Sequence, residues 1–175
     1  MSEASTPSTD ATEPAVYTGD RPRPITDVKL RAARIATGLR GLSVAQNDRY
    51  RIIMRNEVGF VEATLAGGVF GAVPVPVNWH WTGDDLRHLL SGSAAKVAIV
   101  HTDLLPAVER AKPDGLQIVE AETAPEIAAA YGVGEVPLTG RYPTLDELAA
   151  NDRVTDPNTV PPSSVIYTSG TTGLA

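Results

Sequence analysis

The spacing of hydrophobic residues along the chain alternates between a helical period and short continuous runs. The first helical pattern begins near residue 26 and repeats apolar side chains every three or four positions. Its members are Val28, Ala32, Ile35, Leu39 and Leu42. Continuous apolar runs of strand length come next. They predict four strands, over residues 50–55, 72–78, 96–101 and 117–120.

Helices are predicted in the intervals between these strands. The expected ranges are 26–41, 56–70, 82–90 and 103–111, with shorter helices over 125–131 and 144–150. Because helices and strands alternate in this order, the chain is predicted to have an α/β fold. We expect a layered, largely parallel sheet that is flanked by helices.

Glycines, prolines and acidic residues refine these elements. Gly67 and Gly68 fall inside a predicted helix, where each costs about 1 kcal/mol relative to alanine, which suggests close packing or an early helix end. Pro74 and Pro76 lie in a predicted strand and favour a position at the sheet edge. Asp103 directly precedes a helical pattern and is expected to cap it.

The two ends of the chain differ from the middle. Residues 1–24 are rich in Ser, Thr, Pro and Ala and show no periodicity, so we expect a disordered leader. The remainder, residues 25–175, is predicted to be one partial α/β domain. Its last apolar run, Val165 to Tyr167, indicates a further buried strand.

Composition narrows the classes of protein that remain. The chain has 175 residues, 42% of them hydrophobic and 21% charged, which is ordinary for a globular protein. The net charge of −6 argues against nucleic acid or an anionic membrane as a partner. There is no cysteine, which removes disulfides and thiolate sites and fits a reducing compartment. No transmembrane run or signal peptide is evident, so a cytoplasmic location is expected.

Six consecutive residues after the last strand, Thr168 to Gly173, are all Ser, Thr or Gly. Backbone N–H groups in such a loop can converge on an anion, and four hydroxyl groups add further donors, so phosphate is the expected ligand. A flexible linker or a frayed terminus remains the alternative from composition alone. The loop is not a Walker A motif, because that pattern requires G-x-x-x-x-G-K-[ST]. Ser169 also lacks the G-x-S-x-G context of a nucleophile.

A family resemblance rests on this loop and on two stretches upstream. Residues 167–173 resemble the phosphate-loop signature of the adenylate-forming, or AMP-binding, enzymes, which include acyl-CoA synthetases, peptide-synthetase adenylation domains and luciferase. Residues 71–78 and 93–97 resemble segments that precede the loop in that family, so the likeness covers about residues 26–175. Residues 77–81 favour the fatty-acid–CoA ligase type. Ala175 departs from the pattern, which usually has proline at that position.

The resemblance implies a two-step ligase that uses ATP, Mg²⁺ and coenzyme A. A small-molecule carboxylate reacts with ATP to give an acyl-adenylate and pyrophosphate, and coenzyme A then displaces AMP to form a thioester. By the same resemblance, the residues expected to bind the ATP phosphates are Thr168, Ser169, Gly170, Thr171, Thr172 and Gly173. No catalytic or metal-binding residue of the family is expected within this chain.

Other candidate residues have simpler explanations. Of the three histidines, His88 is expected on a helix surface and His80 in a packing or turn role. His101 ends a strand, where ligands often bind in α/β sheets, but a structural role is the favoured reading. The acidic pairs Asp84-Asp85 and Asp146-Glu147 begin predicted helices, where negative charge is favourable without catalysis.

The family places its remaining machinery after the phosphate loop, including a hinge and a small domain with a catalytic lysine. We therefore expect the chain to be the N-terminal fragment of a larger enzyme and to be inactive alone. The alternative is a non-catalytic, truncated or degenerate α/β module that acts in binding or interaction. In either case, an uncovered apolar patch and a free sheet edge predict self-association.

Overall fold

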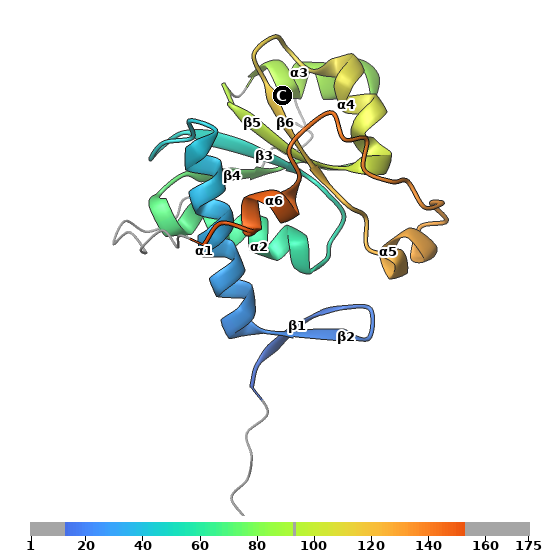
Figure 1. Cartoon of the computed structure of the whole chain (residues 1–175). Helices are drawn as coiled ribbons and strands as arrows, with labels where there is room; N and C mark the ends of the chain where they lie inside the picture. The colour runs from blue at the N-terminus through green and yellow to red at the C-terminus, as the bar shows by residue number, and fades with distance from the viewer. Residues whose placement is uncertain (1–12, 93, 153–175) are drawn as a thin grey trace, which may run out of the picture.

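The computed structural model describes residues 13–92 and 94–152. Its strands are β1 (Ala15–Thr18), β2 (Arg21–Pro24), β3 (Arg49–Ile53), β4 (Val73–Pro76), β5 (Val97–His101) and β6 (Gln117–Ala121) (Figure 1). Its helices are α1 (Ile25–Gly41), α2 (Val58–Phe70), α3 (Gly83–Gly92), α4 (Leu105–Ala111), α5 (Pro125–Ala130) and α6 (Leu145–Ala149), with a 3-10 turn, η1, over Thr102–Leu104. The alternation predicted from the hydrophobic pattern is therefore confirmed.

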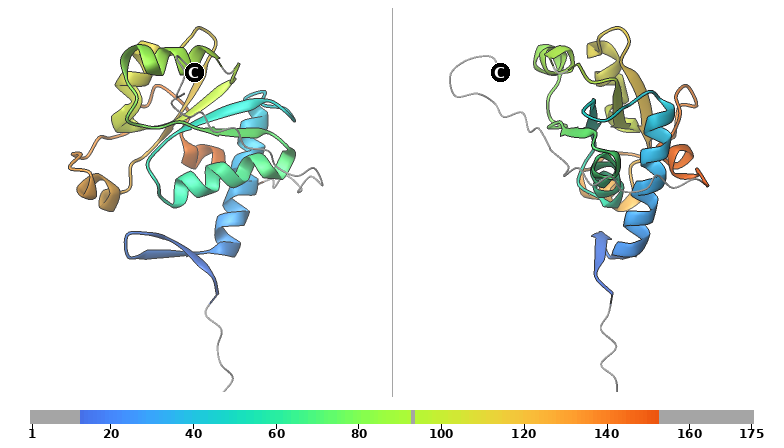
Figure 2. Two further views of the ribbon diagram at one scale, coloured as in Figure 1. Left: turned by 180° about the vertical axis from the view of Figure 1, so that it is seen from behind. Right: turned by 90° about the vertical axis from the view of Figure 1, so that its left-hand side faces the viewer.

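Four strands form a parallel sheet in the order β4-β3-β5-β6. The register sets Ile52 opposite Ile99 and Ile99 opposite Val119, so branched apolar side chains form a row across the centre. Helices cover both faces (Figure 2). This is the layered α/β arrangement expected for a sheet whose strands read as continuous apolar runs.

Successive side chains of β3 and of β5 point to opposite faces of the sheet, and each face has its own hydrophobic core. Ile52 and Ile99 belong to the core beneath α1, α2 and α6, whereas Ile53 and Val100 belong to the core beneath α3 and α4. Arg51 also enters the second layer, where it is fully buried and donates from Nη2 to the Leu89 carbonyl in the last turn of α3. A cation is favourable there because the helix C-terminus carries partial negative charge.

Two predictions from the sequence are confirmed, one about the edge of the sheet and one about close packing. β4, with its two prolines, lies at the edge of the sheet. At Gly67, a Cβ atom would lie 2.7 Å from Tyr50 Oη and 2.8 Å from the Ala72 carbonyl oxygen. No real Cβ approaches other atoms that closely, so α2 reaches β3 and β4 only because residue 67 has no side chain.

The prediction of a disordered leader through residue 24 is wrong for its final part. β1 and β2 form an antiparallel hairpin, with Ala15 opposite Pro24 and Thr18 opposite Arg21. Polar contacts attach the hairpin to the rest of the domain: Thr18 Oγ1 accepts the Val58 N–H at 2.9 Å, and Arg23 donates to Glu62 at 2.5 Å. These partners lie far along the sequence, so local composition gave no sign of them.

The caps of two helices also differ from expectation. Asp103 does not cap α4, because the chain forms η1 first and the N-cap position is Leu104, without a side-chain cap. At α6 the structure adds a capping box, in which Thr144 Oγ1 accepts the Glu147 N–H at 3.0 Å and Glu147 accepts the Thr144 N–H at 2.8 Å. This reciprocal pair satisfies donors that a helix start leaves open.

Candidate functional site

The order of the strands identifies one edge of the sheet as the place where a ligand is most expected. The chain passes from β3 to β4 on one side and then returns to place β5 on the other side of β3. In open α/β sheets, ligands bind beyond the carboxyl ends of the strands at such a switch point. Four ionisable residues lie there: Arg55 and Glu57 follow β3, His101 ends β5, and Asp103 lies in η1.

Arg55 and Asp103 form a two-pronged ion pair between the ends of β3 and β5. Nη1 donates to Oδ1 at 2.8 Å, and Nη2 lies 2.8 Å from Oδ2. The side chains are only 4% and 8% exposed. Burial acts to raise the pKa of Asp103, but hydrogen bonds from Arg55 and from Thr123 Oγ1, 2.9 Å away, outweigh it and leave the pKa below its usual value. The carboxyl group is therefore ionised at neutral pH.

His101 is fully buried and has one role for each ring nitrogen. Nδ1 accepts the backbone N–H of Arg55 at 3.2 Å, so the ring proton lies on Nε2, which is 3.0 Å from Glu57 Oε1. Glu57 is the N-cap residue of α2. The histidine thus fixes the end of β3 relative to the start of α2, in line with the structural role favoured from the sequence.

Aromatic side chains cover the Arg55 guanidinium. Its Cζ atom lies 4.6 Å from the centroid of the Trp79 ring and 5.1 Å from that of Tyr131, and these two rings meet edge to face. His80 stacks on Trp79 with a centroid separation of 3.5 Å, which agrees with the packing role expected for it. Cation–π contacts of this kind add about 0.5–2 kcal/mol each. We call Arg55, Glu57, His101 and Asp103 the switch-point cluster.

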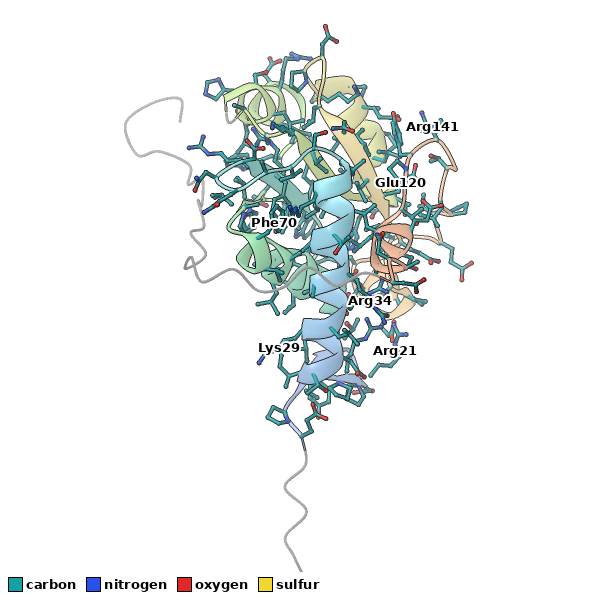
Figure 3. All side chains as sticks on the ribbon, turned by 60° about the vertical axis from the view of Figure 1, so that its left-hand side comes forward. Arg21, Lys29, Arg34, Phe70, Glu120 and Arg141 are labelled. Atoms are coloured by element: carbon teal, nitrogen blue, oxygen red, sulfur yellow. The ribbon has the colours of Figure 1, made fainter. Side chains whose placement is uncertain are left out.

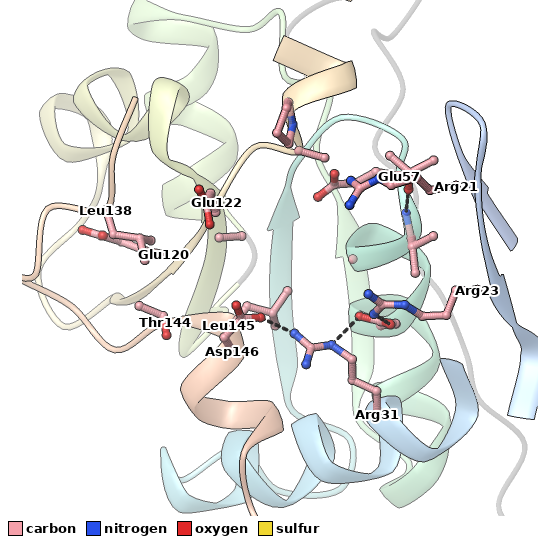
Figure 4. Close-up of a pocket in the computed structure, with 17 residues that line it drawn as sticks. Arg21, Arg23, Arg31, Glu57, Glu120, Glu122, Leu138, Thr144, Leu145 and Asp146 are labelled. Atoms are coloured by element: carbon pink, nitrogen blue, oxygen red, sulfur yellow. Dashed lines mark hydrogen bonds and ion pairs between the residues drawn. The ribbon is translucent and has the colours of Figure 1, made fainter. Parts of the chain in front are cut away.

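A polar cavity of about 360 Å³ lies beside this cluster, between the hairpin, α1, the start of α2 and the start of α6 (Figure 4). Glu62, which is 1% exposed, accepts from Arg23 Nη1 at 2.5 Å and from Arg31 Nε at 2.8 Å. Arg31 also pairs with Asp146. One guanidinium thereby joins α1, α2 and α6. Glu57 lines the cavity as well, so it connects the cavity with the switch-point cluster.

The chemistry available in these two places is positioning rather than bond making. Arg55 faces Asp103, and Arg23 and Arg31 face Glu62, at hydrogen-bonding distance, which suits these charged pairs to hold backbone elements in place. Within residues 13–92 and 94–152, no group of three or more His, Asp or Glu side chains is arranged to hold a metal ion. In the same part of the chain, no helix has the length and apolar character needed to cross a membrane.

The phosphate-loop residues predicted from the sequence, Thr168 to Gly173, lie outside the described residues. Of the other candidates, His101 falls within the switch-point cluster, and His88 is exposed on α3. Sequence reasoning missed Arg55, Glu57 and Asp103 as members of one cluster. Polar residues directly after two strand ends were the available signal, but their meaning depends on which strands are neighbours.

Comparison with known proteins identifies a family. The chain matches the family model described as AMP-binding enzyme over residues 7–175. It is 28% identical over 165 residues to the fatty acid–[acyl-carrier-protein] ligase ScoC of Streptomyces coeruleorubidus, covering 94% of this chain and 29% of the relative. It is 29% identical over 150 residues to a 4-hydroxybenzoate–CoA/benzoate–CoA ligase of Rhodopseudomonas palustris, covering 81% and 25%.

Comparison with solved structures shows that the same fold occurs in a known ligase. The structure of the anthranilate CoA ligase AuaEII in complex with anthranoyl-AMP superposes with a TM-score of 0.71 at 25% identity, over 93% of this chain and 30% of that one. The chain thus spans less than a third of the length of these two relatives and of this structure.

Proposed function

The chain belongs to the AMP-binding enzyme family, and from this membership we propose that it is the N-terminal part of an ATP-dependent acyl-CoA synthetase. The observation that carries the proposal is the extent of the family match, which runs through residues 168–173 to residue 175. The proposed reaction joins a carboxylic acid to coenzyme A. The likeness to relatives named as ligases for fatty and aromatic acids supports this reaction class.

In the first step, a carboxylate oxygen attacks the α-phosphorus of ATP, which forms the acyl-adenylate and releases pyrophosphate. In the second, a thiolate attacks the acyl carbon, and AMP leaves. The residues proposed to hold the phosphates are Thr168 to Gly173. Their hydroxyl and backbone N–H donors would face the charge that develops on the departing pyrophosphate, which is the arrangement that lowers such a barrier most effectively.

The proposal extends to the co-substrates and the setting of the reaction. Mg²⁺ is proposed to accompany ATP, and coenzyme A to be the thiol, although one relative is named for an acyl-carrier-protein acceptor. We also propose a cytoplasmic location, where ATP, Mg²⁺ and coenzyme A are available. Since the relatives are more than three times as long, the chain from 1 to 175 is proposed to be inactive alone.

Carboxylate-dependent exchange of pyrophosphate into ATP tests the first step directly. We expect exchange from a protein in which the reading frame continues past residue 175, assayed with a panel of fatty and benzoic acids, and none from residues 1–175. In the longer protein, Thr172→Ala should lower exchange by about 10²-fold through loss of one phosphate donor. Ser163→Ala, which lies before the loop, is the matched control and should leave exchange unchanged.

Three results would count against the proposal. Exchange by residues 1–175 would refute the inactivity of the fragment. A longer protein that shows no exchange with any acid of the panel would refute the ligase assignment. A stop codon directly after residue 175 would favour the non-catalytic α/β module.

A further inference from the structure

The β1–β2 hairpin, residues 15–24, stands apart from the parallel sheet. Among the described strands, β1 and β2 pair only with each other, and they lie beside the start of α1 (Figure 1). Of their residues, Thr18 alone is buried, and Tyr17 is 64% exposed. An isolated two-stranded hairpin is marginally stable at best. The position of this hairpin therefore depends on its side-chain contacts with the rest of the domain.

Two of these contacts are ion pairs. Arg23 Nη1 lies 2.5 Å from Glu62 Oε1. Arg21, which lies beside the start of α1 (Figure 3), donates to both carboxylate oxygens of Glu126, with 2.8 Å between Nη2 and Oε2. The side chains of Arg23 and Arg21 are 44% and 65% exposed. Ion pairs that reach solvent contribute little and are screened by salt, so the attachment of the hairpin should weaken as ionic strength rises.

The third contact is a hydrogen bond between the hairpin and the first residue of α2. Thr18 Oγ1 accepts the Val58 N–H at 2.9 Å. The first N–H groups of a helix have no partner within the helix, so the protection of this N–H from solvent depends on Thr18. The exchange rate of the Val58 amide hydrogen therefore reports whether the hairpin is in place.

The hairpin forms one wall of the polar cavity of about 360 Å³. Thr18, Arg21 and Arg23 line the cavity from the hairpin, and Glu57 lines it from the start of α2 (Figure 4). Cavities that accept small molecules have volumes of about 300–1,000 Å³. Since Glu57 also lies 3.0 Å from His101 Nε2, the hairpin separates solvent from a group that belongs to the switch-point cluster.

The base of the hairpin is held more firmly than its turn. β2 runs directly into α1 at Pro24, and the Ile25 N–H donates to the Pro14 carbonyl at 2.8 Å. This backbone bond ties both strands to the start of α1. The turn, at residues 18–21, is attached at its outer end by the exposed pair of Arg21 with Glu126. The turn is therefore the end that can move.

Displacement of the hairpin leaves each of its partners with a substitute. Glu62 keeps a second cation, because Arg31 Nε lies 2.8 Å from Oε2. Glu126 is 32% exposed, so water can replace Arg21, and water can likewise accept the Val58 N–H. None of these steps strands a buried charge, which is what makes the separation of an ion pair costly.

We propose that the hairpin is a lid on the polar cavity, latched by the Arg21–Glu126 and Arg23–Glu62 ion pairs and hinged at its base. When it is closed, the lid keeps solvent from the Val58 N–H and from the cavity side of Glu57. When it is open, water and small polar molecules reach that carboxylate. The lid follows from these contacts alone and does not rest on the proposed ligase reaction.

Amide hydrogen exchange of the chain from 1 to 175, followed by NMR, measures opening at the Val58 N–H. Exchange there should quicken about three- to tenfold between about 20 mM and about 500 mM NaCl, because salt screens the two ion pairs. Amides of β5, inside the parallel sheet, should not change. Arg21→Gln should raise the low-salt rate toward the high-salt rate. Arg87→Gln is the matched control, since Arg87 pairs with Asp84 on α3, and it should leave Val58 exchange unchanged.

A disulfide separates movement of the lid from melting of the hairpin. A Cβ atom at Gly19 would lie 3.3 Å from Glu126 Cβ, close to the roughly 3.5–4.5 Å found in disulfides, and the chain has no cysteine of its own. In oxidised Gly19→Cys/Glu126→Cys, Val58 exchange should be slow and independent of salt. Reduction should make it fast, because the Arg21 partner is then missing. If thiol titration shows that the bond has not formed, the salt series and Arg21→Gln decide.

Three outcomes would overturn the proposal. Val58 exchange that responds neither to salt nor to Arg21→Gln would show that the ion pairs are not a latch. An equal response in β5 would show that salt acts on the whole domain. Salt-dependent exchange in the oxidised variant would show that the hairpin melts instead of moving as a lid. Circular dichroism confirms that each variant is folded.

Discussion

Replacement of Arg55 by methionine tests whether the switch-point cluster holds the ends of β3 and β5 together. The variant removes both Nη donors from Asp103, which is 8% exposed and keeps only the Thr123 hydroxyl. A buried carboxylate that loses its cation costs about 3–5 kcal/mol. Arg55→Met should therefore lower the free energy of unfolding by about that amount, which is a large share of the stability of a small domain.

A double-mutant cycle isolates the ion pair from the other contacts of Arg55. In Arg55→Met/Asp103→Leu no buried charge is left unpaired, so the double variant should be more stable than the sum of the single changes predicts. We expect a coupling free energy of about 2–3 kcal/mol. The lost stacking of Arg55 on Trp79 occurs in the single and the double variant alike and cancels in the cycle.

Urea unfolding, followed by tryptophan fluorescence and circular dichroism, provides the four free energies. Asp84→Asn is the matched control, because Asp84 pairs with Arg87 but is 94% exposed, and such pairs contribute little. A coupling free energy below about 0.5 kcal/mol would show that the pair is not the element that joins the two strands.

The pH dependence of stability provides a separate test of the same pair. The pKa of Asp103 is lowered in the folded protein, so its contribution is fully present above the unfolded-state value of about 3.9. That contribution is lost as the pH falls through the lower, folded-state value. Stability should decline in acid below about pH 4, and Asp103→Leu should show a shallower decline. Equal slopes for the two proteins would contradict the assignment.

Three further predictions concern packing, capping and the hairpin. Gly67→Ala should destabilise the protein by about 1–3 kcal/mol, because the new Cβ meets Tyr50 and the Ala72 carbonyl. Gly41→Ala is the control and should leave stability unchanged, because its Cβ would have nothing within 4 Å. Equal melting temperatures for the two variants would refute the steric argument. Thr144→Ala should cost about 1 kcal/mol through loss of the α6 cap, measured by urea unfolding, and no change would argue against the capping box. Glu62→Gln should speed amide hydrogen exchange in residues 15–24, and unchanged exchange there would show that the arginines do not hold the hairpin.

The sequence predicted most of the regular structure because the periods of hydrophobic residues are local. The strands and helices from residue 25 to residue 121 lie close to their expected ranges. The prolines of β4 correctly indicated an edge, since a residue without an N–H cannot donate to a neighbouring strand. Gly67 correctly indicated a close approach between α2 and its neighbours.

For the functional site, the sequence predicts a phosphate loop over Thr168 to Gly173, because a run of glycines and hydroxyl residues has a recognisable local order; this stays a prediction, since the loop lies outside the described residues. It did not supply the switch-point cluster. Arg55 and Asp103 are 48 residues apart, and no periodicity connects them. Asp103 was expected to cap a helix, but its carboxylate pairs with the Arg55 guanidinium instead. An ion pair to a buried cation is a stronger interaction than a hydrogen bond to a helix N–H group.

By itself, then, the sequence determined the class of fold, the kinds and order of most elements, and the family. Only the tertiary structure decided which strands are neighbours, and with them the switch point, the ion pairs of the cavity and the hairpin at residues 15–24. The reason is physical: a hydrophobic period specifies which face of an element is buried, but not what buries it. Charged residues find partners across long stretches of chain, and those partners become apparent only once the sheet has brought its strands together.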